Sequence, residues 1–368
     1  MTNLFFAHPA SIELGHINHH VILIDATYRT CKYNLPLFHM VGQTATGHTF
    51  SLAFCYMERE NDNGYIWALQ ELKMLFQPPR IPKVIIMDCE PALKMAIELV
   101  FPSSIHNYCT WHISKNLIQN CRKYFQEDDW KDYQTSWNLL VSSKSTEEYE
   151  NNLEKIKEKS NDYSGAWAYI SNNLLPFKKK FVTAWASQHP HLGNQASSRV
   201  ESAHSYIKSF INNSNGELST VFQNFKTAID IQLKHIHHTM GKERVQKLTD
   251  VSPPFKQLLG TISIKAIKII EDQFQKLKHQ PNLQPCSKTL TNGMGIPCSH
   301  EIEKLLNTKG YIGSEDFHPQ WNLLYNPLED HDSNSQWNLK QQMEKIEKEV
   351  DEHKIPLKKI DQANSGAT

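Results

Sequence analysis

Two short, wholly apolar runs constrain the fold of this chain more than any other feature of its sequence. Residues 21–24 read Val-Ile-Leu-Ile and are followed by Asp25, and residues 84–87 read Val-Ile-Ile-Met and are followed by Asp88. Continuous apolar runs of this length, rich in β-branched residues, are typical of strands buried on both faces of a sheet. We therefore predict an α/β layer in which these two strands are central and each ends in an acid.

The residues between and after these runs are predicted to extend the same α/β layer. Residues 35–44 and 49–57 are rich in apolar and aromatic side chains and are separated at Gly47, which predicts a hairpin. Helices are expected over 66–76, which precedes two prolines, and from Pro91 to Val100. A short strand over 105–109 and a helix over 111–124 complete this part. The strand and helix signals alternate, as they do in α/β domains.

Beyond residue 125 the strand signal disappears. Residues 126–191 are rich in Glu, Lys, Asn and Trp at helical spacing, and further helices are expected after Ser197-Ser198, over 217–248 and over 255–280. Residues 281–321 are expected to be rich in loops, and a charged helix is expected from Gln336. We predict an all-helical insertion, a mostly helical C-terminal part and no internal repeat.

Composition gives weaker constraints. Lys plus Arg equals Asp plus Glu, 39 each, so the formal net charge is zero, which argues mildly against a nucleic-acid partner. The seven cysteines are scattered and show no disulfide framework. The N-terminal residues lack the pattern of a secretory signal, and no apolar run is long enough to span a membrane. We expect a soluble protein of a reducing compartment.

Asp25 and Asp88 carry the first indication of chemistry. Acids at the carboxyl ends of adjacent parallel strands converge on one crevice, and converging carboxylates bind Mg²⁺ or Mn²⁺. A pair of such ions assists in-line phosphoryl displacement. The alternative is that each Asp only terminates a strand or caps a helix.

Several ordered motifs resemble the transposase domain of Mutator-like elements (MULE), over about residues 5–235. In chain order they are Asp25-Ala26-Thr27-Tyr28-Arg29-Thr30, Tyr33 with Pro36-Leu37, Tyr65-Ile66-Trp67-Ala68-Leu69, Val84 to Asp88, Phe101-Pro102, Cys109-Thr110-Trp111-His112-Ile113-Ser114-Lys115-Asn116, Ser198-Arg199-Val200-Glu201-Ser202 and Ile207-Lys208. An ordered set is more specific than one motif.

The resemblance implies an RNase H-like mixed sheet flanked by helices and a DDE triad of Asp25, Asp88 and Glu201 holding two Mg²⁺ or Mn²⁺ ions. It divides the chain into a first core part (1–125), a helical insertion (126–192), a second core part with the third acid (193–250), a helical linker with a zinc-binding module (251–325) and a charged C-terminal helix and tail (326–368). Metal-dependent cleavage and transfer of DNA at transposon ends would follow, with no covalent protein–DNA intermediate. The implied partners are terminal inverted repeats, target DNA and further copies of the chain, in the nucleus.

Two cysteine–histidine features accompany the acids. Cys109 and His112 belong to the family motif, and the sequence leaves metal binding, a structural role and DNA positioning open. Cys286, Cys298 and His300 resemble a SWIM-type zinc module that lacks one cysteine, since Gln284 and Lys288 stand at the two places where it would be. Either the three residues bind Zn²⁺ with another ligand such as His318, or the module is degenerate and they only pack.

Three other functions fit the same residues. A domesticated or truncated transposase would bind DNA or regulate without cutting it. A nuclease of the same fold would hydrolyse DNA without strand transfer. A zinc-dependent interaction module over 286–300 would use the α/β part as a scaffold. The N-terminal DNA-recognition domain that the resemblance also implies is not found upstream of residue 21 in this sequence.

Overall fold

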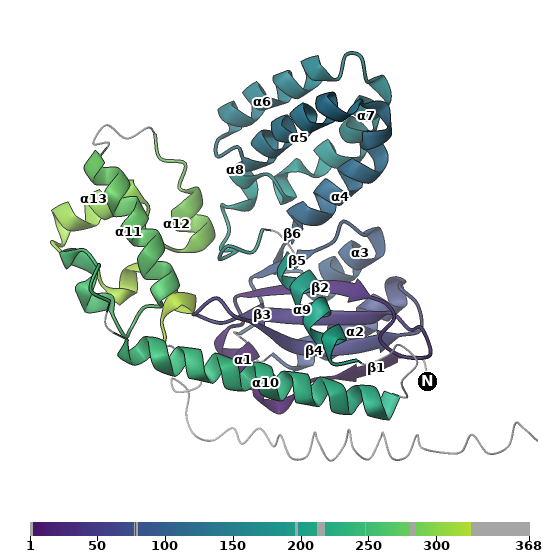
Figure 1. Cartoon of the computed structure of the whole chain (residues 1–368), viewed down its shortest axis with the longest axis horizontal. Coiled ribbons are helices and arrows are strands. Elements are labelled where there is room, and N and C mark those ends of the chain that lie inside the picture. Colours follow the sequence, from purple (N-terminus) through teal and green to yellow (C-terminus); the bar gives the residue numbers. More distant parts are fainter. Residues whose placement is uncertain are drawn as a thin grey trace, which may run out of the picture. The chain divides into compact units, whose positions relative to one another are not determined.

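The structure is a computed structural model and describes residues 3–76, 78, 80–195, 198–211, 218–246, 248–279 and 285–324. The charged helix expected from Gln336 lies outside the described residues. None of the described helices is long and apolar enough to cross a membrane. Figure 1 shows a sheet with helices on it and two further groups of helices.

The sheet has six strands in the order β1-β4-β3-β2-β5-β6. The strands are β1 (Asn3–Phe6), β2 (Val21–Thr27), β3 (Leu37–Gln43), β4 (Thr49–Met57), β5 (Val84–Met87) and β6 (Ile105–Tyr108). The pairs β1–β4, β4–β3 and β3–β2 are antiparallel, and β2–β5 and β5–β6 are parallel. Four strands joined by antiparallel pairing and continued by two parallel strands form an RNase H-like mixed sheet, so the predicted fold class is confirmed.

The two apolar runs occupy the positions predicted for them. All four residues of β5 and the first five of β2 are buried. The predicted hairpin is β3–β4, and its turn is closed by hydrogen bonds from Thr44 N to His48 O (2.9 Å) and from Gly47 N to Thr44 O (2.9 Å). Gly47 has φ +84°, a conformation that residues with a Cβ adopt at a cost. Strand β1 and helix α1 were not predicted.

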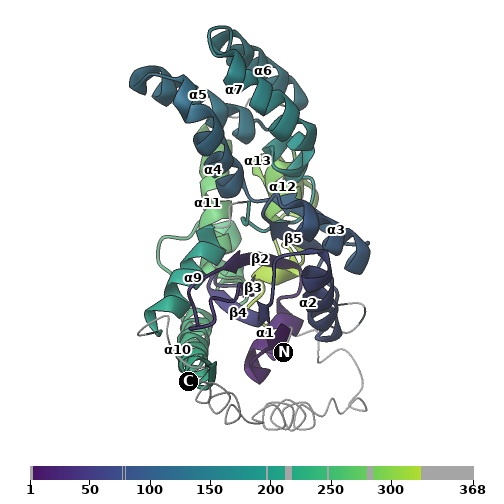
Figure 2. The same ribbon diagram turned by 90° about the vertical axis from the view of Figure 1, so that its right-hand side faces the viewer.

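Helices cover both faces of the sheet (Figure 2). On β3 and β4 the side chains alternate: Phe38 meets Tyr65 of α2, whereas His39 and Phe54 point to the other face, where Phe54 meets Phe225 of α10. The helices around the sheet are α1 (Pro9–Ile17), α2 (Asp62–Met74), α3 (Pro91–Val100), α9 (Ser198–Ser209) and α10 (Leu218–Val245).

Between β6 and α9 the described chain contains helices and no strand. They are α4 (Thr110–Cys121), α5 (Glu127–Ser142), α6 (Thr146–Lys159), α7 (Ser164–Tyr169), a π-helix (Ile170–Leu174), a 3₁₀-helix (Leu175–Lys180) and α8 (Thr183–Ala186). Buried aromatic residues, including Trp130, Tyr133 and Trp137, form the core of this group. Of the four tryptophans in residues 126–192, Trp130 and Trp137 are therefore core residues, while Trp167 and Trp185 are partly exposed.

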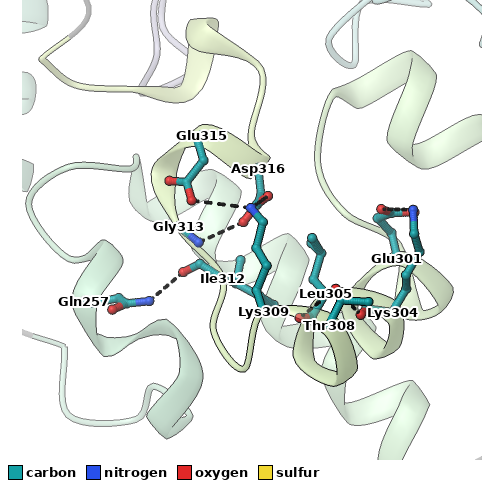
Figure 3. Close-up of polar contacts among 10 residues, drawn as sticks. All are labelled: Gln257, Glu301, Lys304, Leu305, Thr308, Lys309, Ile312, Gly313, Glu315 and Asp316. Carbon is teal, nitrogen blue, oxygen red and sulfur yellow. Dashed lines mark hydrogen bonds and ion pairs between the residues drawn. The ribbon is translucent and has the colours of Figure 1, made fainter.

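The C-terminal part is mostly helical, as expected, and begins with α11 (Ile264–His279). Residues 281–321, which were expected to be rich in loops, also contain the helices α12 (Thr289–Met294) and α13 (Ser299–Thr308). Figure 3 shows how the chain turns after α13: Lys309 Nζ pairs with Asp316 Oδ1 (2.6 Å), and Gly313 N donates to Asp316 Oδ2 (2.9 Å). Gln257 Nε2 donates to Ile312 O (2.7 Å) and ties this turn to the segment before α11.

This part shares a core with the sheet. Val21 and Leu23 of β2 belong to one buried cluster with Val200 of α9, Ile267 of α11 and Trp321. Gln320 Nε2 donates to Asn18 Oδ1 (2.8 Å) and to Gln43 O (2.6 Å), so residues about 300 apart in sequence are joined by buried hydrogen bonds.

Buried histidines make this fold sensitive to acid. Burial lowers the pKa of His20 to about 2 and those of His191 and His318 to about 4. In the unfolded chain these groups take up a proton below about pH 6.5, whereas in the folded chain they remain neutral, so the unfolded state binds more protons as the pH falls. We predict that the free energy of unfolding decreases from about pH 6.5 to about pH 4.

A His318→Asn variant tests this prediction. Asn can still accept the hydrogen bond that His318 Nδ1 accepts from Gln320 N (3.1 Å), but it does not titrate. The free energy of unfolding is measured by urea denaturation at several pH values. In the variant it should fall less steeply with decreasing pH, by up to about 1.4 kcal/mol per pH unit. His238→Asn, on the exposed side of α10, is the control. An unchanged slope for His318→Asn would contradict the assignment.

Candidate metal and nucleic-acid site

The parallel pairing of β2 and β5 brings the first two acids together. Leu23 is in register with Ile86, so Asp25 and Asp88 follow at equivalent positions two residues further on. Asp25 also pairs with His39 across β3 and therefore points to the face that α9 covers. Asp88 Oδ1 accepts a hydrogen bond from Cys89 N (2.6 Å). The two carboxylates thus lie at one end of the sheet, as the sequence predicted.

Helix α9 brings in the third acid. Val200, Ala203 and Ile207 form its buried face, and Glu201 lies in its first turn beside that face. Arg199 fixes the start of the helix: its Nη1 donates to Gly47 O and to Thr49 Oγ1, both at 2.8 Å. This bond between α9 and the β3–β4 turn, which sequence reasoning missed, holds Glu201 at the end of β2.

His112 occupies the centre of the three acids. Its Nε2 lies 3.9 Å from Asp25 Oδ2 and 3.8 Å from Glu201 Oε1, and its Nδ1 lies 3.9 Å from Asp88 Oδ1. The two residues of the Cys-x-x-His motif therefore have different roles. Cys109 is buried and caps α4, since its Sγ accepts from His112 N at 3.4 Å, while the imidazole projects among the carboxylates.

A second histidine, His204, completes the cluster and was not predicted. It stands one turn after Glu201 on α9 and is 4% exposed. Its Nδ1 lies 3.9 Å from both Asp25 Oδ2 and Glu201 Oε2. The signal for it is present in the sequence, because residues three apart share a helix face, and Glu201-x-x-His204 has that spacing.

The site carries more negative charge than its surroundings compensate. Burial, followed by the charges of Glu201 and Asp88, raises the pKa of Asp25 to about 8. Burial also lowers the pKa of His112, against the opposite effect of Asp88 and Glu201, and lowers that of His204 to about 3. The imidazoles are therefore held neutral and do not balance the acids. One buried and two half-buried carboxylates with neutral nitrogen donors are the chemistry that fits a divalent cation.

Ligand atoms of Asp25, His112 and Glu201 all lie within 4.8 Å of one another, which suits a shared ion after small adjustments. Cations and aromatic rings border these residues. Lys208 Nζ donates to Thr27 Oγ1 (2.6 Å), and Lys115 Nζ lies 5.0 Å from the centre of the Trp111 ring. Trp111 is 39% exposed and adjoins the ring of His112. Arg29 is exposed, whereas Lys32 lies over the ring of Tyr33.

The second predicted cluster also forms. Cys286, Cys298 and His300 offer ligand atoms within 4.8 Å of one another, and the two sulfur atoms are 3.6 Å apart. Two thiolates bound at about 2.3 Å to one tetrahedral zinc would be about 3.8 Å apart, so the separation fits. The suggested ligand His318 is not part of this group: its ring lies against His20 and its Nδ1 accepts from Gln320 N. Gln284 lies outside the described residues.

The two clusters adjoin different parts of the fold. The cysteine–histidine cluster lines a cavity of about 940 Å³ together with Ser187 and His191 from the end of the helical segment and Lys276 from α11. The acid cluster lies where β2, β5, α4 and α9 meet. Cys109 is a member of neither group, so among the described residues it contributes no ligand to a metal cluster.

Comparisons with known proteins identify one domain of the chain and several similar proteins. The profile described as the MULE transposase domain matches residues 21–116, which include Asp25, Asp88 and His112. The chain is 23% identical over 293 residues to Protein FAR1-RELATED SEQUENCE 5 of Arabidopsis thaliana (73% of this chain, 36% of that protein) and 26% identical over 164 residues to Protein FAR1-RELATED SEQUENCE 4 (43% and 21%).

The other similarities cover a small part of the matched protein or have low sequence identity. The chain is 25% identical over 366 residues to the PKS-NRPS hybrid synthetase cheA of Chaetomium globosum, covering 87% of this chain and 8% of that protein. It thus spans a small part of the curated relatives it matches. Two structures of the HTLV-2 integrase catalytic core domain in complex with magnesium align at 15% and 14% identity, each with a TM-score of 0.19, over 35% and 45% of this chain and 90% and 95% of those chains. The profile match identifies a MULE transposase domain over residues 21–116, and the strand order of the sheet is compatible with it.

Proposed function

We propose that this chain is the catalytic core of a DDE-type DNA transposase that cuts and joins DNA strands with the help of divalent metal ions. The observation that carries the proposal is the convergence of Asp25, Asp88 and Glu201 around His112 at one end of an RNase H-like sheet. These acids come from β2, from the end of β5 and from α9, and sequence distances of 63 and 113 residues separate them. Core packing alone gives no reason to bury Asp25 beside two other acids, because Asp88 and Glu201 each make the ionised form of Asp25 less favourable.

The three acids would hold Mg²⁺ or Mn²⁺. When bound, such ions activate the attacking oxygen and stabilise the charge that develops on the leaving oxygen of a phosphodiester. Water would attack the phosphodiester at the transposon end and release a 3′-hydroxyl. That hydroxyl would attack a phosphodiester of the target DNA in the same site and displace the 3′-oxygen of the target strand, which leaves as a 3′-hydroxyl, so the strands are joined without a covalent protein intermediate.

Other side chains of the site would position DNA. Lys115, Lys208 and Arg29 lie near the acids, and their charges would contact phosphates along the strand that enters. Trp111 presents an exposed ring at the rim of the acid cluster, where an unpaired base could stack. The neutral net charge of the chain is compatible with such a local concentration of cations. Action in the nucleus, on terminal inverted repeats and as an oligomer, belongs to the same proposal.

The first prediction concerns cleavage. We expect Asp25→Asn, Asp88→Asn and Glu201→Gln each to reduce the rate of strand cleavage by about 1,000-fold or more, because losing metal contacts costs several kcal/mol in the transition state. The full chain is assayed with Mn²⁺ or Mg²⁺ on supercoiled plasmid and on oligonucleotides with a free 3′-hydroxyl. Asp128→Asn is the control, since this side chain is 99% exposed on α5.

The outcomes of this assay separate the alternatives. Nicking without joining would indicate a nuclease of the same fold. DNA binding without any cutting by the unmodified chain, unchanged by the three substitutions, would indicate a non-catalytic DNA-binding derivative. If the substituted proteins cut as fast as the unmodified chain, the triad assignment is wrong.

The second prediction concerns stability without metal. The folded chain holds the pKa of Asp25 near 8 against an ordinary 3.8, so the folded state binds a proton more tightly than the unfolded state, and stability is lost as the pH rises between these values. Asp25→Asn removes that cost. In buffer with EDTA the melting temperature of this variant should equal or exceed that of the unmodified chain, and the difference should grow up to about pH 8. A lower melting temperature at pH 8 would show that Asp25 stabilises the fold.

The third prediction concerns zinc. We propose that Cys286, Cys298 and His300 hold one Zn²⁺ ion with a structural role, on the basis of their convergence. Purified chain should contain one zinc per molecule in elemental analysis, and Cys298→Ser should lose most of it because an alcohol is a poor zinc ligand. Ser287→Ala, in the same segment, is the matched control. Equal zinc content in Cys298→Ser would refute this site.

A further inference from the structure

The acid cluster contains nitrogen donors as well as carboxylates. Two imidazoles, His112 and His204, face Asp25 and Glu201 from two different helices, α4 and α9. Each ring has one nitrogen atom 3.8 or 3.9 Å from an oxygen atom of each of these two acids. Each acid is therefore approached by both rings: His112 faces Oε1 of Glu201 and His204 faces its Oε2, while ligand atoms of Asp25, His112 and Glu201 lie within 4.8 Å of one another.

The separations have the size expected for ligands of a shared ion. At 3.8–3.9 Å these nitrogen and oxygen atoms are too far apart for direct hydrogen bonds, which require about 3.2 Å or less. Two atoms each bound at about 2.1 Å to one cation can be at most about 4.2 Å apart. The spacing thus leaves room for an ion between the imidazoles and the acids. It does not fit a ring that only orients a carboxylate.

The burial of His204 points the same way. Its side chain is 4% exposed and has its Nδ1 toward the acids, while its Nε2 has no hydrogen-bond partner among the described residues. A buried polar ring without that bond is costly unless its other nitrogen makes a strong interaction. The neighbouring ring is His39, whose centre is 5.4 Å away. The interaction available to His204 is therefore on the side of Asp25 and Glu201.

We propose that His112 and His204 are metal ligands and that, with Asp25 and Glu201, they make one metal position of this site selective for a divalent transition ion over Mg²⁺. Mg²⁺ is a hard ion that prefers oxygen ligands and keeps its waters, whereas transition ions accept imidazole nitrogen. Asp88 lies on the other side of the His112 ring, 3.9 Å from Nδ1, and belongs to a neighbouring position. The role of this ion in DNA cleavage rests on the proposed function, whereas its binding by His112 and His204 does not.

Pulsed electron paramagnetic resonance with Mn²⁺ tests this directly. The full chain with His300→Asn, which leaves the cysteine–histidine cluster without an imidazole, should bind Mn²⁺ with a spectrum modulated by ¹⁴N of coordinated imidazole. His112→Asn and His204→Asn should each weaken the modulation, and the double variant should abolish it. Each substitution should also lower the ratio of Mn²⁺ to Mg²⁺ affinity, measured by competition, by at least about tenfold. His318→Asn is the matched control, because this ring is half-buried and lies against His20, away from the acids.

The opposite results are equally definite. Bound Mn²⁺ without ¹⁴N modulation in the unmodified chain would overturn the inference, and that measurement needs no variant to fold. Unchanged modulation in the double variant, with circular dichroism like that of the parent, would also overturn it. Nitrogen ligation in a chain that never cuts DNA would refute the proposed function and leave this inference standing. DNA cleavage by a chain whose bound ions have only oxygen ligands would support the proposed function and refute this inference.

Discussion

The parallel pairing of β2 with β5 is the constraint on which the rest of the structure depends. Both strands are apolar on both faces, so each must be covered on both sides, and the helices that cover them come from distant parts of the chain. The same pairing aligns the ends of the strands, and therefore two acids, at one edge. Arg199, bound to the β3–β4 turn, then sets α9 across that edge. The fold and the candidate site are consequences of one arrangement.

The buried apolar residues around the site stabilise the fold, whereas the polar residues of the site destabilise it. Val200, Ala203 and Ile207 stabilise α9 by burial, while Glu201 and His204 on the adjoining face bring a charge and an unbonded ring nitrogen close to Asp25. Without a cation the cluster costs stability, which the raised pKa of Asp25 expresses. Such local cost in an otherwise well-packed sheet is typical of sites that bind a ligand. The acid cluster and the cysteine–histidine cluster share this character, but they differ in ligand type and therefore in the metals they favour.

The part of the fold with strong periodic signals was predictable. Strands β2, β3, β4 and β5 and helix α3 follow from apolar runs, from Gly47 and from Pro91, because these signals are local. Strand β1 and helix α1 were missed, since β1 is short, only partly buried and recruited by pairing with β4. The helices α12 and α13 were missed because Gly, Pro and Cys in 286–300 suggest loop, whereas contacts with α11 and the sheet decide their conformation.

The sequence by itself determined which residues are chemically special: three acids in family order, the Cys109–His112 pair and the three possible zinc ligands. Only the tertiary structure decided how they combine. It separated Cys109, which caps a helix, from His112, which stands among the acids; it added His204; and it removed His318 from the zinc cluster. The reason is that side-chain identity and local spacing are written along the chain, whereas the approach of α4 and α9 to the same strand end depends on long-range packing that no local pattern encodes.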